Sequence, residues 1–159
     1  MSINLDHIDK KILSLLQSNA RISNAELAER VNLSPTPCLR RMRRLEEKGL
    51  IRNYRAILDE KKLGFPVSAY VFVNLDKNTR ETAQAFEHDI GLRPEVVECC
   101  VVAGRHDYVL KVVARSLEDY DRFMKEDLAE VKPVADLESM IVLHQSMYRG
   151  GLPIQEAPG

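Results

Sequence analysis

The sequence predicts an α+β protein of two parts, an N-terminal head of three helices and a C-terminal domain built around an antiparallel sheet. Apolar residues repeat at helical spacing in the first third of the chain and alternate as in a strand from residue 67. Charge divides the chain in the same way. Residues 1–66 hold 13 Lys and Arg against 8 Asp and Glu, while residues 67–159 hold 10 against 16. The balances of +5 and −6 give the net charge of −1.

The polar run that ends in Gly64 and Pro66 is typical of a hinge between two domains. The last residues are rich in Gly and Pro and poor in apolar side chains, as in a flexible tail. We therefore expect four segments, a helical head, a hinge, a sheet domain and a tail, over residues 1–57, 58–66, 67–147 and 148–159.

Three helices are expected in the head. A first amphipathic helix follows a possible cap at Asp6. Ser23 and Glu26 have the spacing of a capping box and open a second, short helix that leads into a tight connection at Asn32. Ser34 then suits an N-cap before a third helix that Gly49 ends. Helix, turn and helix in this order are typical of a DNA-binding head.

The third helix has an apolar side and a cationic side. On a helical wheel its apolar residues are Cys38, Leu39, Met42 and Leu45. Thr36, Arg40 and Arg44 recur on the other side, with Arg43 beside them. A charged stripe alone is more often a solvated surface, but here it lies opposite a core-facing stripe in a capped helix-turn-helix, which favours DNA.

Arginine suits this surface because its planar fork pairs bidentately with guanine or with phosphate. We expect Arg41 and Arg52 to contact flanking phosphates and Ser34 to position the helix. The predicted DNA-binding residues are Ser34, Thr36, Pro37, Arg40, Arg41, Arg43, Arg44 and Arg52.

The second domain reads as strand, helix, strand, strand, helix, strand. The segments expected in this order are Val67–Leu75, Thr79–Ile90, Val96–Ala103, Tyr108–Ala114, a helix capped by Ser116, and a strand through Met140, Val142 and His144. This βαββαβ order predicts a ferredoxin-like sheet with both helices on one face. Because both faces of its strands are largely apolar, we expect a second copy of the chain to cover the other face.

No run approaches the roughly 18 apolar residues of a membrane span, and no signal peptide opens the chain, so we expect a cytoplasmic protein with no membrane partner. The three cysteines, Cys38, Cys99 and Cys100, are expected to be free thiols. Neither they nor His106 and His144 have metal-ligand spacing. We expect no metal, no cofactor and no catalytic residue.

Several residues of both domains resemble the Lrp/AsnC family, the leucine-responsive and asparagine regulators. They are Ser34–Arg40, Arg44–Glu46, and Gly104 with Asp107 and Tyr108, in a resemblance that runs from Leu5 to Met147. It implies a bacterial or archaeal transcription factor with a winged-type helix-turn-helix and an effector domain. It also implies dimers that commonly assemble into octamers, and an amino acid as effector. A homodimer suits palindromic double-stranded DNA, because paired recognition helices enter successive major grooves.

The resemblance also implies an effector pocket at the contact between subunits, lined by the turn before the third strand. Its residues here are Gly104, Arg105, His106, Asp107 and Tyr108, with Leu117 and Met140 at other effector-response positions. A glycine admits close approach of a carboxylate to the backbone, and an aspartate can bind an ammonium group. The alternative from the residues alone is a plain hairpin turn in which Asp107 bonds the local backbone, with Leu117 and Met140 in the core.

A second function from another class stays open. Siroheme decarboxylases share this scaffold and use histidine and arginine around a tetrapyrrole, and Arg105 and His106 depart from the acidic and aromatic residues of the leucine-responsive member. The complete cationic helix favours the regulator. We expect an effector bound between subunits to change their arrangement, and with it the affinity for DNA.

Overall fold

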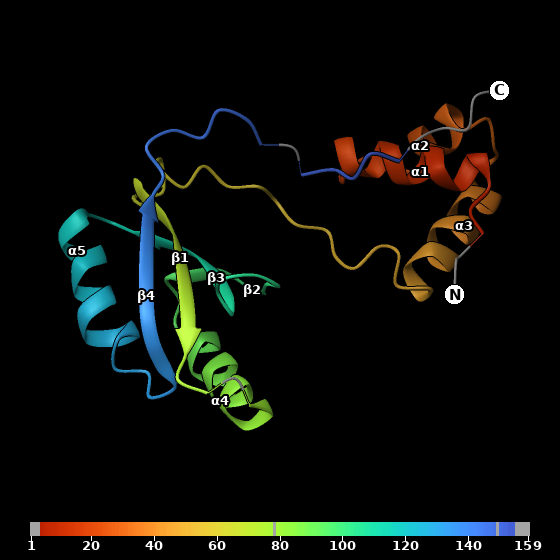
Figure 1. Ribbon diagram of the computed structural model, residues 1–159. Coiled ribbons are helices and arrows are strands. Elements are labelled where there is room, and N and C mark those ends of the chain that lie inside the picture. The colour runs from red at the N-terminus through yellow and green to blue at the C-terminus, as the bar shows by residue number, and fades with distance from the viewer. Residues whose placement is uncertain (1–3, 78, 149, 155–159) are drawn as a thin grey trace. The chain divides into compact units, whose positions relative to one another are not determined.

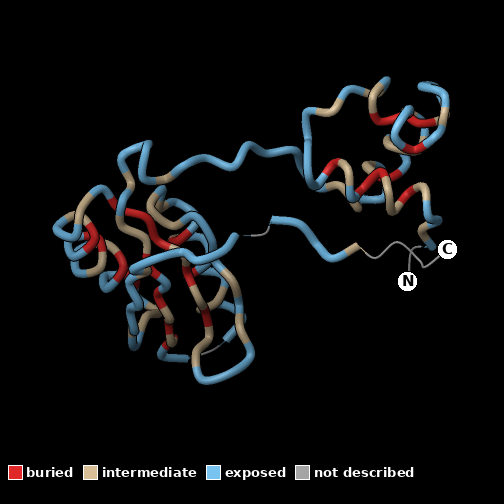
Figure 2. The backbone as a smooth tube through the Cα atoms, turned by 90° about the horizontal axis from the view of Figure 1, so that it is seen from above, coloured by how far each residue is buried: buried red, intermediate tan, exposed pale blue. Residues whose placement is uncertain are grey.

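The computed structural model describes residues 4–77, 79–148 and 150–154. The chain divides into two compact units, Met1–Ile57 with Met147–Gly159, and Leu58–Ser146. Each unit has its own hydrophobic core, and Figure 2 shows the buried residues gathered separately in each. Among the described residues, no helix is both long and apolar enough to cross a membrane.

The first unit contains the three predicted helices, labelled in Figure 1 as α1 (His7–Ser18), α2 (Asn24–Arg30) and α3 (Pro35–Glu47). Their apolar stripes meet in one core, with Ile12, Leu27 and Cys38 fully buried. The helix-turn-helix prediction is therefore confirmed. The positions of the helix ends follow from the residues that cap them.

The side-chain oxygens of Asp6 and Ser23 accept the backbone N–H groups three residues on, as predicted. Asn32 closes the turn before α3 with φ of 55°, and Gly49 follows α3 with φ of 68°. Ser34 is the N-cap of α3, but its side chain makes no capping bond. The helix begins Pro-Thr-Pro, so two of its first three residues have no N–H to donate.

The segment after α3 connects the head to the first strand of the second unit. Residues 51–66 contain no strand, and most of their side chains are exposed, including Tyr54 and Ile57. Tyr54 instead donates its hydroxyl to Glu46 of α3, 2.9 Å away. The helices of the predicted winged-type helix-turn-helix are thus followed by a segment without strand pairing.

The tail does not behave as the free end that we expected. Its described residues 150–154 lie against α1: the Gln17 side chain accepts the N–H of Leu152 at 2.5 Å and donates to the carbonyl of the same residue at 3.2 Å. Ile154 packs on the core of the head. Residues 149 and 155–159 of the predicted tail lie outside the described residues. The Gln17 amide bonds the backbone of Leu152 in the way that a neighbouring strand would. The composition of the tail could not predict this contact.

Removing that side chain tests the contact. We expect Gln17→Ala to lower the free energy of unfolding of the head by about 0.5–1.5 kcal/mol, because both bonds to Leu152 are lost. Hydrogen exchange of residues 150–154 should speed up as well. Gln84→Ala, at an exposed position of a helix in the other unit, is the control. Equal stability and exchange in both variants would contradict the contact.

The second unit is a four-stranded antiparallel sheet in the order β2-β3-β1-β4, with helices over one face. Its elements are β1 (Val67–Leu75), α4 (Arg80–Gly91), β2 (Val96–Val101), β3 (Tyr108–Ala114), α5 (Leu117–Arg122), a π-helical turn η1 (Phe123–Leu128) and β4 (Val134–Ile141). Phe86 of α4 and Phe123 of η1 are buried in the same core as Val71 of β1. The ferredoxin-like prediction is confirmed.

One strand of this sheet was predicted in the wrong place. The expected final strand runs through Met140, Val142 and His144, but β4 ends at Ile141 and begins at Val134. Only the N–H of Val142 continues the pairing, to the carbonyl of Ser68 at 2.9 Å. Because β4 is an edge strand with mostly exposed residues, its first half lacks the apolar alternation that marks a central strand.

The sheet face away from the helices is mixed rather than apolar, which corrects part of our expectation. Tyr70 is 40% exposed there and Met140, opposite it in register, is 52% exposed. Lys111, the other neighbour of Tyr70 in register, bonds Glu60 at 2.6 Å. The face therefore presents apolar side chains to a partner, with charged side chains next to them.

Candidate functional site

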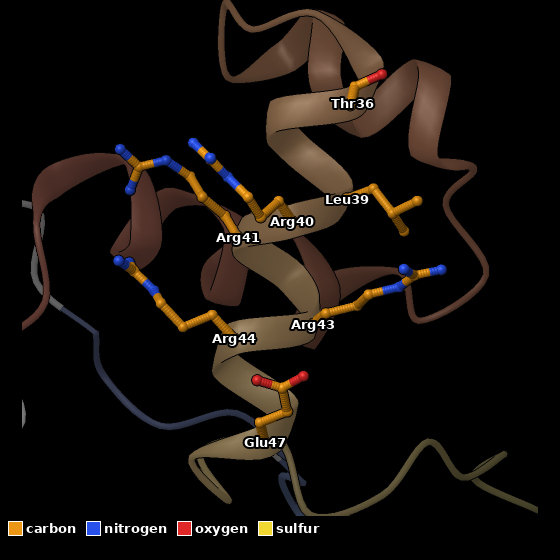
Figure 3. Close-up of a pocket in the computed structure, with 7 residues that line it drawn as sticks. All are labelled: Thr36, Leu39, Arg40, Arg41, Arg43, Arg44 and Glu47. Carbon is orange, nitrogen blue, oxygen red and sulfur yellow. The ribbon is translucent and has the colours of Figure 1, made fainter.

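The face of α3 away from the core carries two arginines that point to solvent. Arg40 and Arg43, here called the outer pair, are exposed and make no ion pair within the residues that the structure describes. Thr36 lies one turn before Arg40 on the same face and is also exposed. A hollow of about 580 Å³ runs along α3, and Figure 3 shows the residues that line it, which are the outer pair, Thr36, Leu39, Arg41, Arg44 and Glu47. An exposed helix face with cations and a hydroxyl is suited to a polyanion.

The other two arginines of α3, Arg41 and Arg44, are held by α1 and are here called the clamped pair. Asp6 and Asp9, the α1 carboxylates, accept their guanidinium groups. Nη1 of Arg41 lies 2.6 Å from Asp6 and 2.8 Å from Asp9. Nη2 of Arg44 lies 2.5 Å from the second oxygen of Asp9. In Figure 3 the clamped pair extends to the same side of α3 as Arg40, and Leu39 and Arg43 extend to the other side.

Burial decides how firmly this clamp holds. The side chain of Asp9 is 1% exposed, and both of its oxygens bond the clamped pair. Removing one partner of a buried ion pair costs on the order of 3–5 kcal/mol, whereas an exposed pair contributes about 0–1 kcal/mol. The arginine side chains are less buried, 25% exposed for Arg41 and 45% for Arg44, so the unfavourable part of an exchange for a solvent-exposed phosphate is the loss of a partner by the buried Asp9 carboxylate. The clamped pair braces α3 on α1.

The pKa values agree with this arrangement. Partial burial opposes ionisation of Asp6, but the N–H of Asp9 and the Arg41 guanidinium outweigh it and hold the pKa of Asp6 below its ordinary value. The hydrogen bonds to both α1 carboxylates raise the pKa of Arg41. Since the folded pKa of Asp6 lies below its unfolded value, its contribution to stability is complete at neutral pH and is lost as the pH falls through the folded pKa.

The turn between β2 and β3 has a glycine that its own chain does not require. Gly104 does not have a positive φ, and a Cβ built on it meets nothing within 4 Å. The neighbouring Arg105 is exposed as well. Neither backbone strain nor crowding within the chain explains a glycine here, which leaves room for something outside the chain to approach.

Asp107 braces this turn on β1. Its carboxylate accepts the N–H of Leu75 at 2.9 Å, and its own N–H bonds the carbonyl of Val73 at 3.0 Å. Its carbonyl accepts the N–H of Val102 at 3.0 Å, which closes the hairpin. The hairpin role considered for Asp107 from the sequence is therefore real, and any ligand role must coexist with it.

His106 lies on the sheet face away from the helices. Its ring packs on Phe72 with centroids 5.1 Å apart, and its Nε2 lies 3.4 Å from Glu138 of β4. Its Nδ1 is buried and has no hydrogen-bond partner in the residues described. His106 thus ties the turn to β4 and keeps one polar atom unsatisfied.

Tyr108 does not join the turn residues but points into the core under α4. Its ring packs on Phe86 with centroids 4.6 Å apart, and its hydroxyl donates to Glu87 at 3.0 Å. Burial, together with the Glu87 carboxylate, raises the pKa of Tyr108 to about 12. It lines a second hollow, of about 290 Å³, between α4 and β2.

The remaining predicted residues are spread over the two units. Leu117, at the start of α5, and Met140 of β4 are both more than half exposed, so neither is a core residue. Arg52 is exposed after α3, and Pro37 is half-buried in its first turn. Sequence reasoning missed Asp9, whose signal was an acidic residue within the apolar stripe of α1.

Cys38, Cys99 and Cys100 are free. Over the described parts of the chain, no group of three or more His, Cys, Asp or Glu side chains could hold a metal ion. The two features that stand out are therefore the outer pair on α3 and the turn at Gly104.

Both units resemble domains of known proteins. Residues 5–52 match the winged helix-turn-helix DNA-binding family, and residues 68–152 match the Lrp/AsnC ligand binding domain. The chain belongs to the Lrp/AsnC family. Lrp/AsnC membership makes it a DNA-binding transcriptional regulator with a ligand-binding domain, in which α3 belongs to the DNA-binding part and the turn at Gly104 to the ligand-binding part.

Two relatives that match this chain over nearly their whole length are transcriptional regulators. The chain is 40% identical over 156 residues to the transcriptional regulator AzlB of Bacillus subtilis, covering 98% of this chain and 99% of that one. It is 41% identical over 150 residues to the Bkd operon transcriptional regulator of Pseudomonas aeruginosa, covering 94% and 98%. Among Lrp/AsnC-like structures, a Neisseria meningitidis regulator solved as a complex with L-Met has a TM-score of 0.90 and 34% identity, covering 95% and 97%.

Proposed function

We propose that this chain regulates transcription without catalysis, by contacting double-stranded DNA through α3 and changing its DNA affinity when an amino acid binds the second unit. The observation that carries the DNA contact is the outer pair, exposed on the face of α3 away from the core. Thr36 adds a hydroxyl to that face, and Arg52 lies beyond the helix for a flanking phosphate. Arginine forks read guanine and clamp phosphate.

We assign the effector to the turn Gly104–Asp107, without Tyr108. Gly104 is unexplained by the chain's own backbone, which fits a ligand carboxylate that approaches the amides closely. Asp107 supplies a carboxylate for an ammonium group. The Neisseria regulator was solved with L-Met, which supports an amino acid as the ligand class. Arg105 and His106 flank this position and would set which amino acid fits.

The sheet face that carries Tyr70 and Met140 is assigned to a homodimer. Two large side chains exposed by 40% and 52% side by side are costly in water and are covered when a second copy packs on them. Paired heads then suit a palindromic site. An effector between copies stabilises one assembly and so shifts DNA affinity, by linkage.

DNA selection tests the first part of the proposal. The full chain is mixed with a random library of duplexes, and bound sequences are recovered over several rounds. We expect a palindromic consensus whose affinity exceeds that of random duplex by at least about 10³-fold. Failure to enrich any sequence would overturn a specific regulator. An absorbance spectrum of the purified protein serves as the check for the siroheme-decarboxylase alternative, since a tetrapyrrole absorbs visible light.

Ligand screening tests the second part. Each of the twenty amino acids is added in a thermal-shift assay, where a bound ligand at 100 times its dissociation constant stabilises the protein by about 2.7 kcal/mol. We expect one or a few to raise the melting temperature and to change affinity for the selected duplex. Sedimentation of the full chain should give a dimer or larger at micromolar concentration, and a monomer there would refute the homodimer.

A further inference from the structure

We propose that the α1 carboxylates limit the positive charge that α3 offers to DNA. They hold the clamped pair on the α1 side of the helix, so that only the outer pair is left to contact phosphates and bases. The inference rests on the proposed contact between α3 and DNA, and it adds the control of charge to the roles of Asp6, the cap of α1, and Asp9, a buried residue of α1.

The geometry keeps this clamp in place when DNA arrives. Both oxygens of Asp9 are used, one by each arginine, and the side chain is 1% exposed. A phosphate that drew either arginine away would leave a buried carboxylate short of a partner, which is more unfavourable than the exposed contact is favourable. Asp6 adds a second oxygen to Arg41 at 2.6 Å. The clamped pair therefore stays on α1 in the complex.

Charge compensation follows from the distances. Each guanidinium of the clamped pair lies within 2.8 Å of a carboxylate, so the four charges cancel in pairs. Screening at physiological salt acts over about 8 Å, and beyond that range, among the four arginines of α3, only the outer pair presents uncompensated charge. Four arginines in one helix thus act on DNA as two.

This restraint has a consequence for how the protein searches DNA. Affinity for any sequence grows with the number of phosphates that cations neutralise, and the logarithm of the binding constant falls with the logarithm of salt in proportion to that number. Two compensated arginines keep non-specific binding weak. Discrimination between sequences then depends more on the outer pair, whose forks can reach base edges.

Asp6→Asn tests the inference in the full chain. Asparagine still caps α1 by accepting the N–H of Asp9, so the helix start is kept. One carboxylate then remains for two guanidinium groups, which leaves one net positive charge beside α3. We expect the slope of log K against log salt on random duplex to steepen by about 0.9, or about 3.5-fold more loss of affinity between 50 and 200 mM salt.

A matched control has the same change in net charge elsewhere. Glu118→Gln removes one exposed acid of α5 in the other unit, and its salt dependence should equal that of the wild type. Asp6→Ser removes the same carboxylate as Asp6→Asn and also keeps an N-cap oxygen, so it serves if the asparagine variant does not fold. Circular dichroism melts verify that each variant is folded at the assay temperature.

The outcomes separate this inference from the proposed function. Arg40→Ala is measured alongside and should lower the slope by about 0.9, since it removes a contacting cation. If Arg40→Ala lowers the slope but both Asp6 variants match the wild type, α3 contacts DNA and the role of the α1 carboxylates is refuted. If Arg40→Ala changes nothing, α3 is not the contacting helix and the proposed DNA interface fails together with the inference.

Discussion

Replacing both arginines of the outer pair by alanine is expected to lower the affinity for the selected duplex by about 2–6 kcal/mol, since a bidentate contact to a base contributes about 1–3 kcal/mol. The substitutions Arg40→Ala and Arg43→Ala remove exposed side chains, so the head should stay folded. The loss should be smaller on random duplex, because only phosphate contacts are lost there. Fluorescence anisotropy at fixed salt measures both.

The control for this double variant removes two positive charges from another exposed segment. Lys61→Ala with Lys62→Ala changes net charge equally in the turn before Phe65, which belongs to the other unit. Its affinity should stay close to that of the wild type. A folded Arg40→Ala, Arg43→Ala protein that binds the selected duplex as tightly as this control would exclude α3 as the reading helix.

The sequence could place the arginines on a helix face but could not tell which of them form ion pairs with α1. A helical wheel puts Arg44 beside Arg40, and we predicted both to contact DNA. What separates them is Asp9, 35 residues from Arg44 in sequence and 2.5 Å from it in space. The partner of a charged side chain depends on how α1 packs on α3, which no local pattern records. Arg43, beside the predicted stripe, belongs to the outer pair instead.

The most accurate predictions were the element ends that depend on residues close together in the sequence. Caps, a glycine stop and a period-two pattern gave the ends of α2, α3 and β3 closely, because each is decided by residues within a few positions. β4 was misplaced because an edge strand has only weak apolar alternation. Tyr108 was assigned to the effector by resemblance, although its alternation with Leu110 and Val112 already indicated the core.

Asp107 presents the sharpest test of the effector proposal, because its two roles can be separated by one atom. Asp107→Asn keeps an amide oxygen that can accept the N–H of Leu75, so the brace to β1 is retained. It removes the negative charge that we assign to the ligand's ammonium group. A hydrogen bond to a charged group contributes about 1.5–3 kcal/mol, so we expect effector affinity to fall by about 10- to 100-fold.

Asp107→Ala is the companion variant. It removes the acceptor of Leu75, whose backbone lies at the buried end of β1, and should lower the free energy of unfolding by about 1–3 kcal/mol as well as effector affinity. Calorimetric titration with the screened amino acid, run beside a thermal melt, measures both quantities. If Asp107→Asn binds the amino acid like the wild type while only Asp107→Ala melts early, the carboxylate serves the hairpin alone, and the ammonium group must be bound elsewhere. Affinity for the selected duplex without effector should stay unchanged in both variants, because the outer pair belongs to the other unit.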